Sequence, residues 1–98
     1  MEFSGFDWDA ANRTKCQKHG VTIAAIESLF LRGVMILPDT EHSQEEFCFR
    51  AIGHTEQERA IFVVFTMRRR AGERFIRPIS ARYMHKKEVE HYAKTYKT

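Results

Sequence analysis

The run from Ala60 to Met67, AIFVVFTM, restricts the fold of this 98-residue chain more than any other feature. It is apolar at successive positions, so a strand formed by it must be covered on both faces, as a central strand is. The letters RRRAGE that follow contain Gly72 and predict a hairpin turn. RFIRPISAR, residues 74–82, predicts the strand that returns beside it. The middle of the fold is therefore expected to be an antiparallel hairpin.

Pro78 stands inside that returning strand and has no N–H to donate to a neighbouring strand. The strand must therefore carry an edge or a β-bulge at this position. Side chains alternate along a strand, so Arg77 is expected on the face opposite to Ser80 and Arg82 unless a bulge resets the register.

The segment before residue 34 predicts one strand and two helices. Met1 to Trp8 is rich in aromatic residues and predicts a short strand. Asp9 predicts the N-cap of a helix over residues 10–19, and Gly20 predicts its end. Thr22 predicts the N-cap of a second helix, whose apolar residues share one face at helical spacing: Ile23, Ile26 and Phe30, with Ala25 and Leu29.

Two further strands and a final helix complete the predicted elements. VMILPD (34–39) and FCFRAIGHT (47–55) predict strands, with the acidic TEHSQEE (40–46) as the loop between them. In the second of these strands, alternation places Cys48, Arg50 and Ile52 on one side. The last helix is expected to start near His85 and to carry one stripe made of Val89, Tyr92 and Tyr96.

This order predicts a single α+β domain over residues 1–98. The expected architecture is a mainly antiparallel twisted sheet of about five strands, an estimate from the count of strand-like segments. Two N-terminal helices are expected on one face, and a C-terminal helix follows the sheet, with the helices packed against one face.

Charge is distributed unevenly along a chain whose net charge is +3. Residues 67–98 contain ten Lys or Arg and three acids, whereas residues 39–46 contain four acids and neither Lys nor Arg. A basic half of this kind suits a polyanion or an acidic protein partner. A merely solvated surface is the alternative interpretation, because charge runs are commonly that.

The cysteines and the short motifs limit the classes of chemistry. Cys16 and Cys48 are the two cysteines and predict a reducing compartment without disulfides. Cys16 and His19 have ligand spacing, but no second pair follows at zinc-finger distance, so no metal site is expected. Phosphate-binding glycine loops and G-x-S-x-G elbows do not occur, and no cofactor is expected. The longest apolar run is far too short to cross a bilayer, so we expect a cytoplasmic protein with no membrane contact.

Basic and amphoteric side chains gather where the predicted strands and helices end. They are Lys15, Lys18, His19, Arg68, Arg77, Ser80, Arg82, Tyr83 and His85. RNA cleavage without metal requires activation of the 2′-OH, a proton for the 5′-oxygen and positive charge for the phosphorane. Arginine supplies that charge with a planar fork that matches phosphate oxygens. The residues alone predict a basic α+β domain with RNA as a candidate ligand.

Most of these side chains also have a purely structural interpretation. His19 at a helix end can complement the helix dipole, and Arg77 can pair with an acid such as Glu46. Tyr92 can pack in the core with its hydroxyl at the rim. Arg82 has the weakest structural alternative, because it lies beyond the buried strand and before a helix whose N-terminal amides can also hold an anion.

Four motifs occur in a characteristic order: FDWD (6–9), KHGV (18–21), LPD (37–39) followed by an acidic run, and IRPISAR (76–82). Together they resemble the BrnT family of bacterial type II toxins over nearly the whole chain. The resemblance implies a RelE-like fold and an endoribonuclease that arrests translation by cutting RNA, with ribosome-associated messenger RNA as the expected substrate. It also implies a cognate BrnA-like antitoxin, a ribbon-helix-helix protein that represses the shared operon, so operator DNA is bound only through the antitoxin.

The resemblance also implies roles for individual residues. The KHG match falls on Lys18 and His19, the SAR match on Ser80 and Arg82, and the basic end of the central strand on Arg68. Arg82 and Arg68 are expected to hold and stabilise the scissile phosphate, while Lys18 assists electrostatically. His19 or His85 is expected to carry protons. The residues expected to contact substrate are Lys15, Arg77, Tyr83 and Ser80.

Family members often carry further basic residues after SAR, whereas Tyr83, Met84 and His85 follow here. Tyr83 or His85 could therefore take over proton transfer. The alternative function is a non-catalytic module that binds nucleic acid or a partner without cutting, favoured by the lack of a clear acid–base pair. A third interpretation is an interaction domain whose basic half pairs with an acidic protein.

Overall fold

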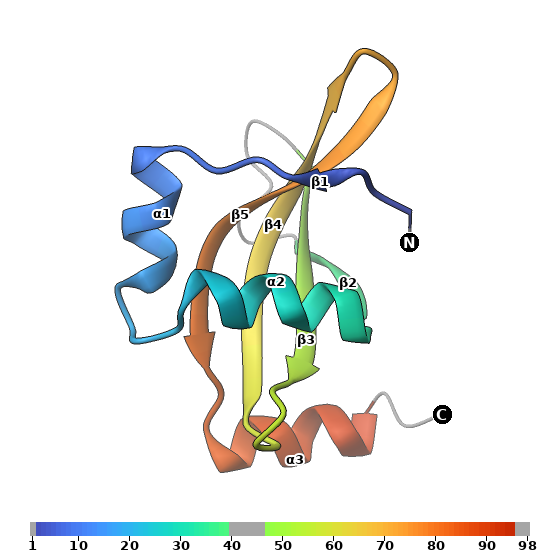
Figure 1. The fold of residues 1–98 in the computed structure, drawn as a ribbon. Coiled ribbons are helices and arrows are strands. Elements are labelled where there is room, and N and C mark those ends of the chain that lie inside the picture. The colour runs from blue at the N-terminus through green and yellow to red at the C-terminus, as the bar shows by residue number, and fades with distance from the viewer. Residues whose placement is uncertain (1, 40–46, 96–98) are drawn as a thin grey trace.

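The computed structural model describes residues 2–39 and 47–95, which form a five-stranded sheet and three helices (Figure 1). The elements are β1 (Gly5–Phe6), α1 (Ala10–Gln17), α2 (Ile23–Arg32), β2 (Met35–Asp39), β3 (Cys48–His54), β4 (Ala60–Arg70), β5 (Glu73–Tyr83) and α3 (Lys86–Thr95). The predicted loop 40–46 and Tyr96 lie outside the described residues. The α+β class expected from the sequence is confirmed.

The strands are ordered β1-β5-β4-β3-β2, so the apolar run of β4 is central, as its two-sided pattern predicts. Strands β2 to β5 pair antiparallel with their neighbours in the chain. β1 instead pairs parallel with β5, through Gly5 opposite Phe75 and Phe6 opposite Ile76. The sheet is therefore mixed, which corrects the antiparallel expectation: the chain passes through two helices before β2, and β1 remains on the opposite edge.

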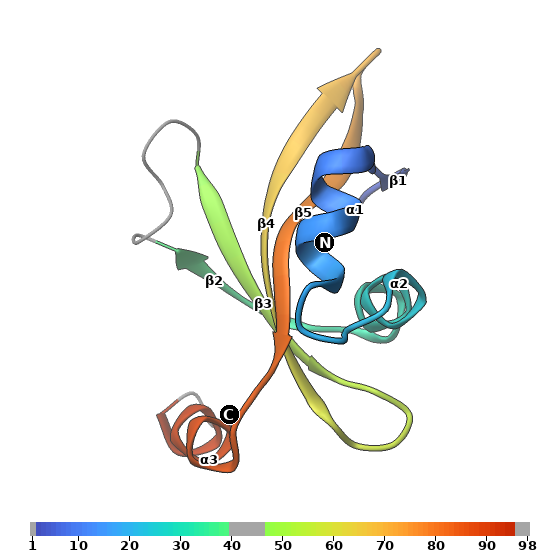
Figure 2. The same cartoon turned by 90° about the vertical axis from the view of Figure 1, so that its left-hand side faces the viewer.

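Helices α1 and α2 cover one face of the sheet, where the larger core cluster lies (Figure 2). Ile26, Leu29 and Phe30 of α2 are buried against β4 and β5, and the ring of Phe30 meets that of Phe65 edge-on at 5.1 Å. α2 approaches β3 closely at Gly53, where an added Cβ would lie 2.8 Å from Cγ of Leu29. The helical spacing of the α2 residues therefore predicted their burial correctly.

The opposite face has a smaller apolar cluster, made of Cys48, Ile52, Phe62 and Val64. Tyr92 of α3 packs against this cluster, and α3 lies on this side of the sheet in Figure 2. The expectation that the helices pack against one face therefore does not hold for α3. The physical reason is that β5 ends in Tyr83 beside the start of β4, and Met84 turns the chain towards the smaller cluster.

A β-bulge interrupts the β4–β5 ladder, as Pro78 predicts. Phe65 opposes Pro78 and Val64 opposes Ser80, so Ile79 is the additional residue. The extra residue resets the alternation of β5. Arg77, Ser80 and Arg82 consequently oppose Thr66, Val64 and Phe62, and all three share the face of the smaller cluster.

The predicted caps hold the N-terminal helices in place. The Asp9 side chain accepts a hydrogen bond from the Asn12 N–H, and Gly20 adopts the positive φ of +87° that ends the first helical segment. Thr22 caps α2 in the same way, through the Ala25 N–H. The buried Asn12 amide also donates to the carbonyl oxygens of Asp7 and Pro78, both at 2.9 Å. This contact joins α1 to β5 at the bulge.

Candidate active site between the sheet and the C-terminal helix

A pocket with a volume of about 330 Å³ lies between the smaller-cluster face and α3. We refer to it as the arginine pocket. It is lined by His19, Arg50, Phe62, Val64, Ser80, Ala81, Arg82, Glu88 and Tyr92. The cross-strand register explains the set, because Arg50, Val64 and Ser80 lie in one row of the sheet and Phe62 and Arg82 lie in the next.

Arg82 forms a bidentate contact with Glu88 of α3. Its Nη1 and Nη2 donate to the two carboxylate oxygens of Glu88 at 2.7 and 2.8 Å. Its guanidinium lies over the ring of Phe62, 4.8 Å from the centroid. The bond from Arg82 and a second one from the His85 N–H lower the pKa of Glu88 to about 2. Both partners are therefore fully charged at neutral pH.

Arg50 is the second cation of the pocket. Its Nη1 donates to the hydroxyl of Tyr92 and its Nη2 to Oδ1 of Asp39, both at 3.3 Å. The Asp39 side chain is fully buried, whereas 22% of the Arg50 side chain is exposed. Burial acts to lower the pKa of Arg50, but the contacts with Tyr92 and Asp39 outweigh it and raise that pKa. Arg50 also lies over Phe62, 5.5 Å from the centroid.

Both guanidinium groups therefore lie over the ring of Phe62, and both stay charged at every physiological pH. Each has a carboxylate partner, but a planar guanidinium has five N–H donors and can bind further oxygens. Such a pair is suited to an oxyanion with several acceptor oxygens.

Three of the residues predicted from the sequence meet in this pocket: Arg82, Ser80 and His19. His19 lies in the turn between α1 and α2. α1 packs against β5 and so brings this turn close to the strand that carries Ser80 and Arg82. It is exposed, so its imidazole can reach solvent and a bound ligand. A cationic centre, a hydroxyl and an imidazole thus lie around one hollow.

The other predicted residues lie outside the pocket lining. Lys15 and Lys18 are exposed on α1 and at its C-cap. Arg68 is half-buried on β4 opposite Phe75, towards the hairpin tip. His85 directly precedes α3 and is exposed.

Arg77 and Tyr83 take part in other contacts. The Arg77 guanidinium lies 2.9 Å from the carboxylate of Asp9 and 3.6 Å from that of Asp7, so it joins β5 to the start of α1. It therefore has acidic partners, as its structural interpretation expected, while Glu46 lies outside the described residues. Tyr83 packs with the larger cluster on the opposite face, where Arg59 lies 3.6 Å above its ring.

Sequence reasoning did not single out Arg50, Glu88 or Phe62 as site residues. Alternation did place Arg50 on the side of Cys48 and Ile52, which was the one signal for it. The alignment of Arg50 with Ser80 depends on the register of three strands, and a single sequence does not specify that register.

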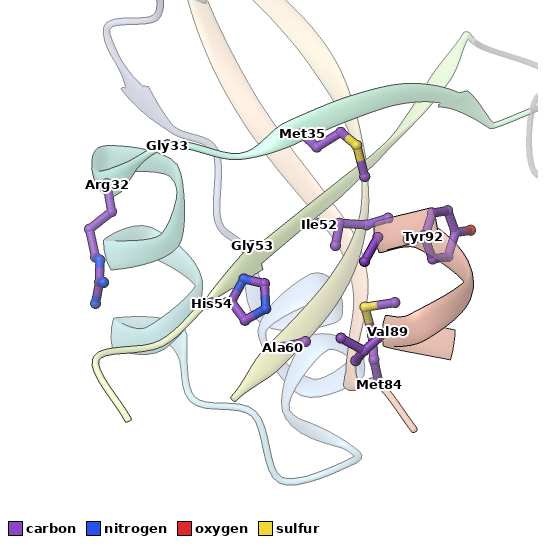
Figure 3. Close-up of a pocket in the computed structure, with 11 residues that line it drawn as sticks. Arg32, Gly33, Met35, Ile52, Gly53, His54, Ala60, Met84, Val89 and Tyr92 are labelled. Carbon is purple, nitrogen blue, oxygen red and sulfur yellow. The ribbon is translucent and has the colours of Figure 1, made fainter. Parts of the chain in front are cut away.

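A larger and more apolar hollow of about 560 Å³ also has Tyr92 in its lining (Figure 3). Met84, Val89 and Tyr92 line it from α3 and the segment before it, and Met35 and Ile52 line it from the sheet. Arg32, at the end of α2, lies across the hollow from these residues in Figure 3. This hollow lacks the paired cations of the arginine pocket.

The described residues contain neither a metal-ligand cluster nor a membrane-spanning helix. Within residues 2–39 and 47–95, no three side chains of the His, Cys, Asp and Glu types gather as metal ligands would. In the same part of the chain, no helix has the length and apolar character needed to span a membrane.

Comparison with known proteins assigns the chain to a family. A search of curated proteins found no similar sequence. The family model described as the ribonuclease toxin BrnT of type II toxin–antitoxin systems matches residues 8–88 of the 98. The matched range includes every residue of the arginine pocket except Tyr92, which lies four positions beyond it. The chain belongs to the BrnT family of ribonuclease toxins.

Proposed function

We propose that this protein is a metal-independent endoribonuclease that arrests translation, and that the arginine pocket is its active site. The observation that carries the proposal is the convergence of Arg82, Arg50 and His19 on one hollow in a chain of a ribonuclease toxin family. The RelE-like character of the fold and a cytoplasmic location are parts of the same proposal.

The reaction is an attack of the 2′-oxygen of a ribose on its own 3′-phosphorus. The 2′-O–P bond forms, the bond from phosphorus to the 5′-oxygen breaks, and a 2′,3′-cyclic phosphate and a 5′-hydroxyl result. The 2′-OH proton leaves to a base, and a proton is delivered to the 5′-oxygen. Negative charge accumulates on the phosphorane oxygens between these steps, and a cationic pocket stabilises it.

Within this pocket Arg82 and Arg50 hold the phosphate and stabilise the phosphorane. His19 is the proton carrier that the pocket lining favours, and His85, just before α3, is the alternative. Ser80 also lines the pocket, and its hydroxyl can donate a hydrogen bond to a phosphate oxygen. Lys15, Lys18 and Arg68 lie outside the lining and contact RNA phosphates on either side of the cleavage point.

The partner in this proposal is a BrnA-like ribbon-helix-helix antitoxin, in keeping with the toxin–antitoxin family. An antitoxin that covers the arginine pocket excludes RNA directly. Operator DNA is then bound through the antitoxin alone. Messenger RNA on the ribosome is the proposed substrate.

Paired induction of the parent chain and Arg82→Lys in growing bacteria tests the proposal. Lysine keeps the charge but loses the planar fork, so cleavage should fall by about 100-fold. Arg74→Lys, the same change at an exposed position on β5, is the matched control and should arrest growth like the parent. Growth and new messenger-RNA ends are the measurements.

Arrest with new RNA ends in the parent and in Arg74→Lys, but not in Arg82→Lys, supports the assignment. Full activity of a soluble Arg82→Lys protein contradicts the assignment of Arg82. Salt-sensitive RNA binding by the purified parent without any turnover favours the non-catalytic module instead.

A further inference from the structure

Two polar side chains of α3 contact the two arginines of the pocket. Glu88 holds Arg82 through two hydrogen bonds, and Tyr92 accepts one from Arg50. Glu88 and Tyr92 lie four positions apart, so they project from the same side of the helix. The helix therefore places a carboxylate and a hydroxyl where a substrate would have to bind.

The carboxylate of Glu88 presents to Arg82 what a phosphodiester presents. Both groups offer two oxygens that share negative charge, and both fit the guanidinium fork. The pair is accessible to solvent, since 39% of the Arg82 side chain and 29% of the Glu88 side chain are exposed. An incoming phosphate can thus reach Arg82 without first opening the core.

α3 is weakly packed compared with the other two helices. None of its residues, Lys86–Thr95, is buried, whereas α2 buries Ile26, Leu29 and Phe30. Val89 and Tyr92 line the hollow of about 560 Å³ (Figure 3), and Tyr92 also packs against the edge of the smaller cluster. An element with few buried contacts opens at low free-energy cost.

We propose that Arg82 and Arg50 form a phosphodiester-binding subsite, and that Glu88 occupies it in the free protein until an RNA phosphate displaces it. This inference rests on the proposed function and adds to it the competition between Glu88 and the RNA phosphate for Arg82. Displacement of Glu88 removes the main polar anchor of α3, so RNA binding loosens the C-terminal helix.

Glu88 also preorganises the subsite in the free protein. It holds the Arg82 guanidinium extended over Phe62, so the cation does not have to find its position when the substrate arrives. The contact therefore lowers RNA affinity by competition and, at the same time, orders the group that binds the phosphate.

Binding of an uncleavable single-stranded oligonucleotide tests the competition. A 2′-O-methyl RNA of about ten nucleotides, within the usual site size of such proteins, lacks the nucleophile and reports affinity alone. Glu88→Gln keeps the shape of the side chain but loses its charge, and should bind about tenfold more tightly by fluorescence anisotropy. The matched control is Glu90→Gln, the same charge change at an exposed site on α3, with an expected gain below about twofold.

A double variant separates the specific contact from general electrostatics. In an Arg82→Lys background, Glu88→Gln should raise the affinity for the oligonucleotide by less than about twofold. The reason is that the guanidinium for which Glu88 and the phosphate compete is then absent. Equal gains for Glu88→Gln and Glu90→Gln, or a full gain in the Arg82→Lys background, would overturn the proposal. Failure of both the parent and Glu88→Gln to bind the oligonucleotide would overturn it as well.

Hydrogen exchange tests the movement of α3 in the parent chain. Addition of the oligonucleotide should speed the exchange of amides in residues 89–95 and leave those of β4 unchanged. Slower exchange in α3 would show that the helix stays docked, and would contradict displacement. Both experiments report binding without turnover, so they can succeed in a chain that does not cut RNA, and the growth experiment can fail independently.

Discussion

Phe62 is the residue on which the candidate site is built, because both guanidinium groups lie over its ring. It comes from the central strand, and only 9% of its surface is exposed, so its position is fixed by the core. An aromatic face adds a cation–π attraction to each arginine without neutralising its charge. The ring of Phe62 thus lies under both cations of the pocket.

Arg50→Lys tests the second cation. The ammonium of lysine can keep the ion pair with Asp39, but it loses the planar fork, so RNA cleavage should fall by about tenfold with the fold retained. The control is Arg59→Lys, where the arginine stacks on Tyr83 on the opposite face and cleavage should not change. Single-turnover cleavage of an RNA oligonucleotide measures both. An unaffected Arg50→Lys rate would remove Arg50 from the active site.

The pH dependence of stability should reveal the Arg82–Glu88 contact. The pKa of Glu88 is about 2 in the folded protein, against an ordinary value of 4.5. A lowered folded-state pKa stabilises the fold fully above pH 4.5, and that contribution is lost as the pH falls from 4.5 towards 2. The urea midpoint of the parent should therefore exceed that of Glu88→Gln at pH 7, and the difference should shrink below pH 4.5. The control is Glu90→Gln, the same charge change at an exposed position on α3.

The site residues differ in how far a sequence can predict them. Arg82 was identified because it was expected beyond the buried strand and before a helix whose N-terminal amides can hold an anion, and because the SAR match falls on it. Its actual partner, Glu88, lies six positions along the chain, beyond a change of direction that a sequence pattern does not specify. Arg77 was expected to contact substrate, yet it contacts Asp7 and Asp9. These contacts depend on the pairing of β1 with β5, two strands that lie far apart in the sequence.

At the scale of the elements, the bulge of β5 decides which groups meet. With Ile79 as the extra residue, Ser80 and Arg82 share a face with Arg50 and Phe62. Pro78 made the bulge predictable, since a proline in an otherwise regular strand requires one or an edge. The packing of α3 was less predictable, because its stripe of Val89 and Tyr92 fits either face equally well.

Asn12 connects two elements at the bulge, and Asn12→Ala tests that connection. The substitution removes the bonds to the carbonyls of Asp7 and Pro78 and half of the capping box, and it leaves buried acceptors unpaired. The free energy of unfolding should fall by about 2–3 kcal/mol. Gln17→Ala on the exposed side of α1 is the control, with an expected change within about 0.5 kcal/mol. Urea unfolding measures both, and equal changes would contradict the role of Asn12.

At the scale of the whole molecule, the sheet separates two kinds of surface. One face is closed by α1 and α2 over a continuous core, and the other carries the arginine pocket under a loosely packed helix. The periodicity of the strands and of α2 predicted the closed face well. The open face depends on register, on the bulge and on the path after β5, which arise from contacts between distant segments.

The parallel pairing of β1 with β5 has a consequence for how the protein is made. Residues 5–6 pair with residues 75–76, so β1 cannot join the sheet before residue 76 has been synthesised. Arg82 emerges from the ribosome later still, and Glu88 follows it. A nascent chain therefore has no complete arginine pocket, because synthesis proceeds from the N-terminus. The pocket of a new chain can therefore bind a phosphate only after residues as late as Glu88 have been synthesised.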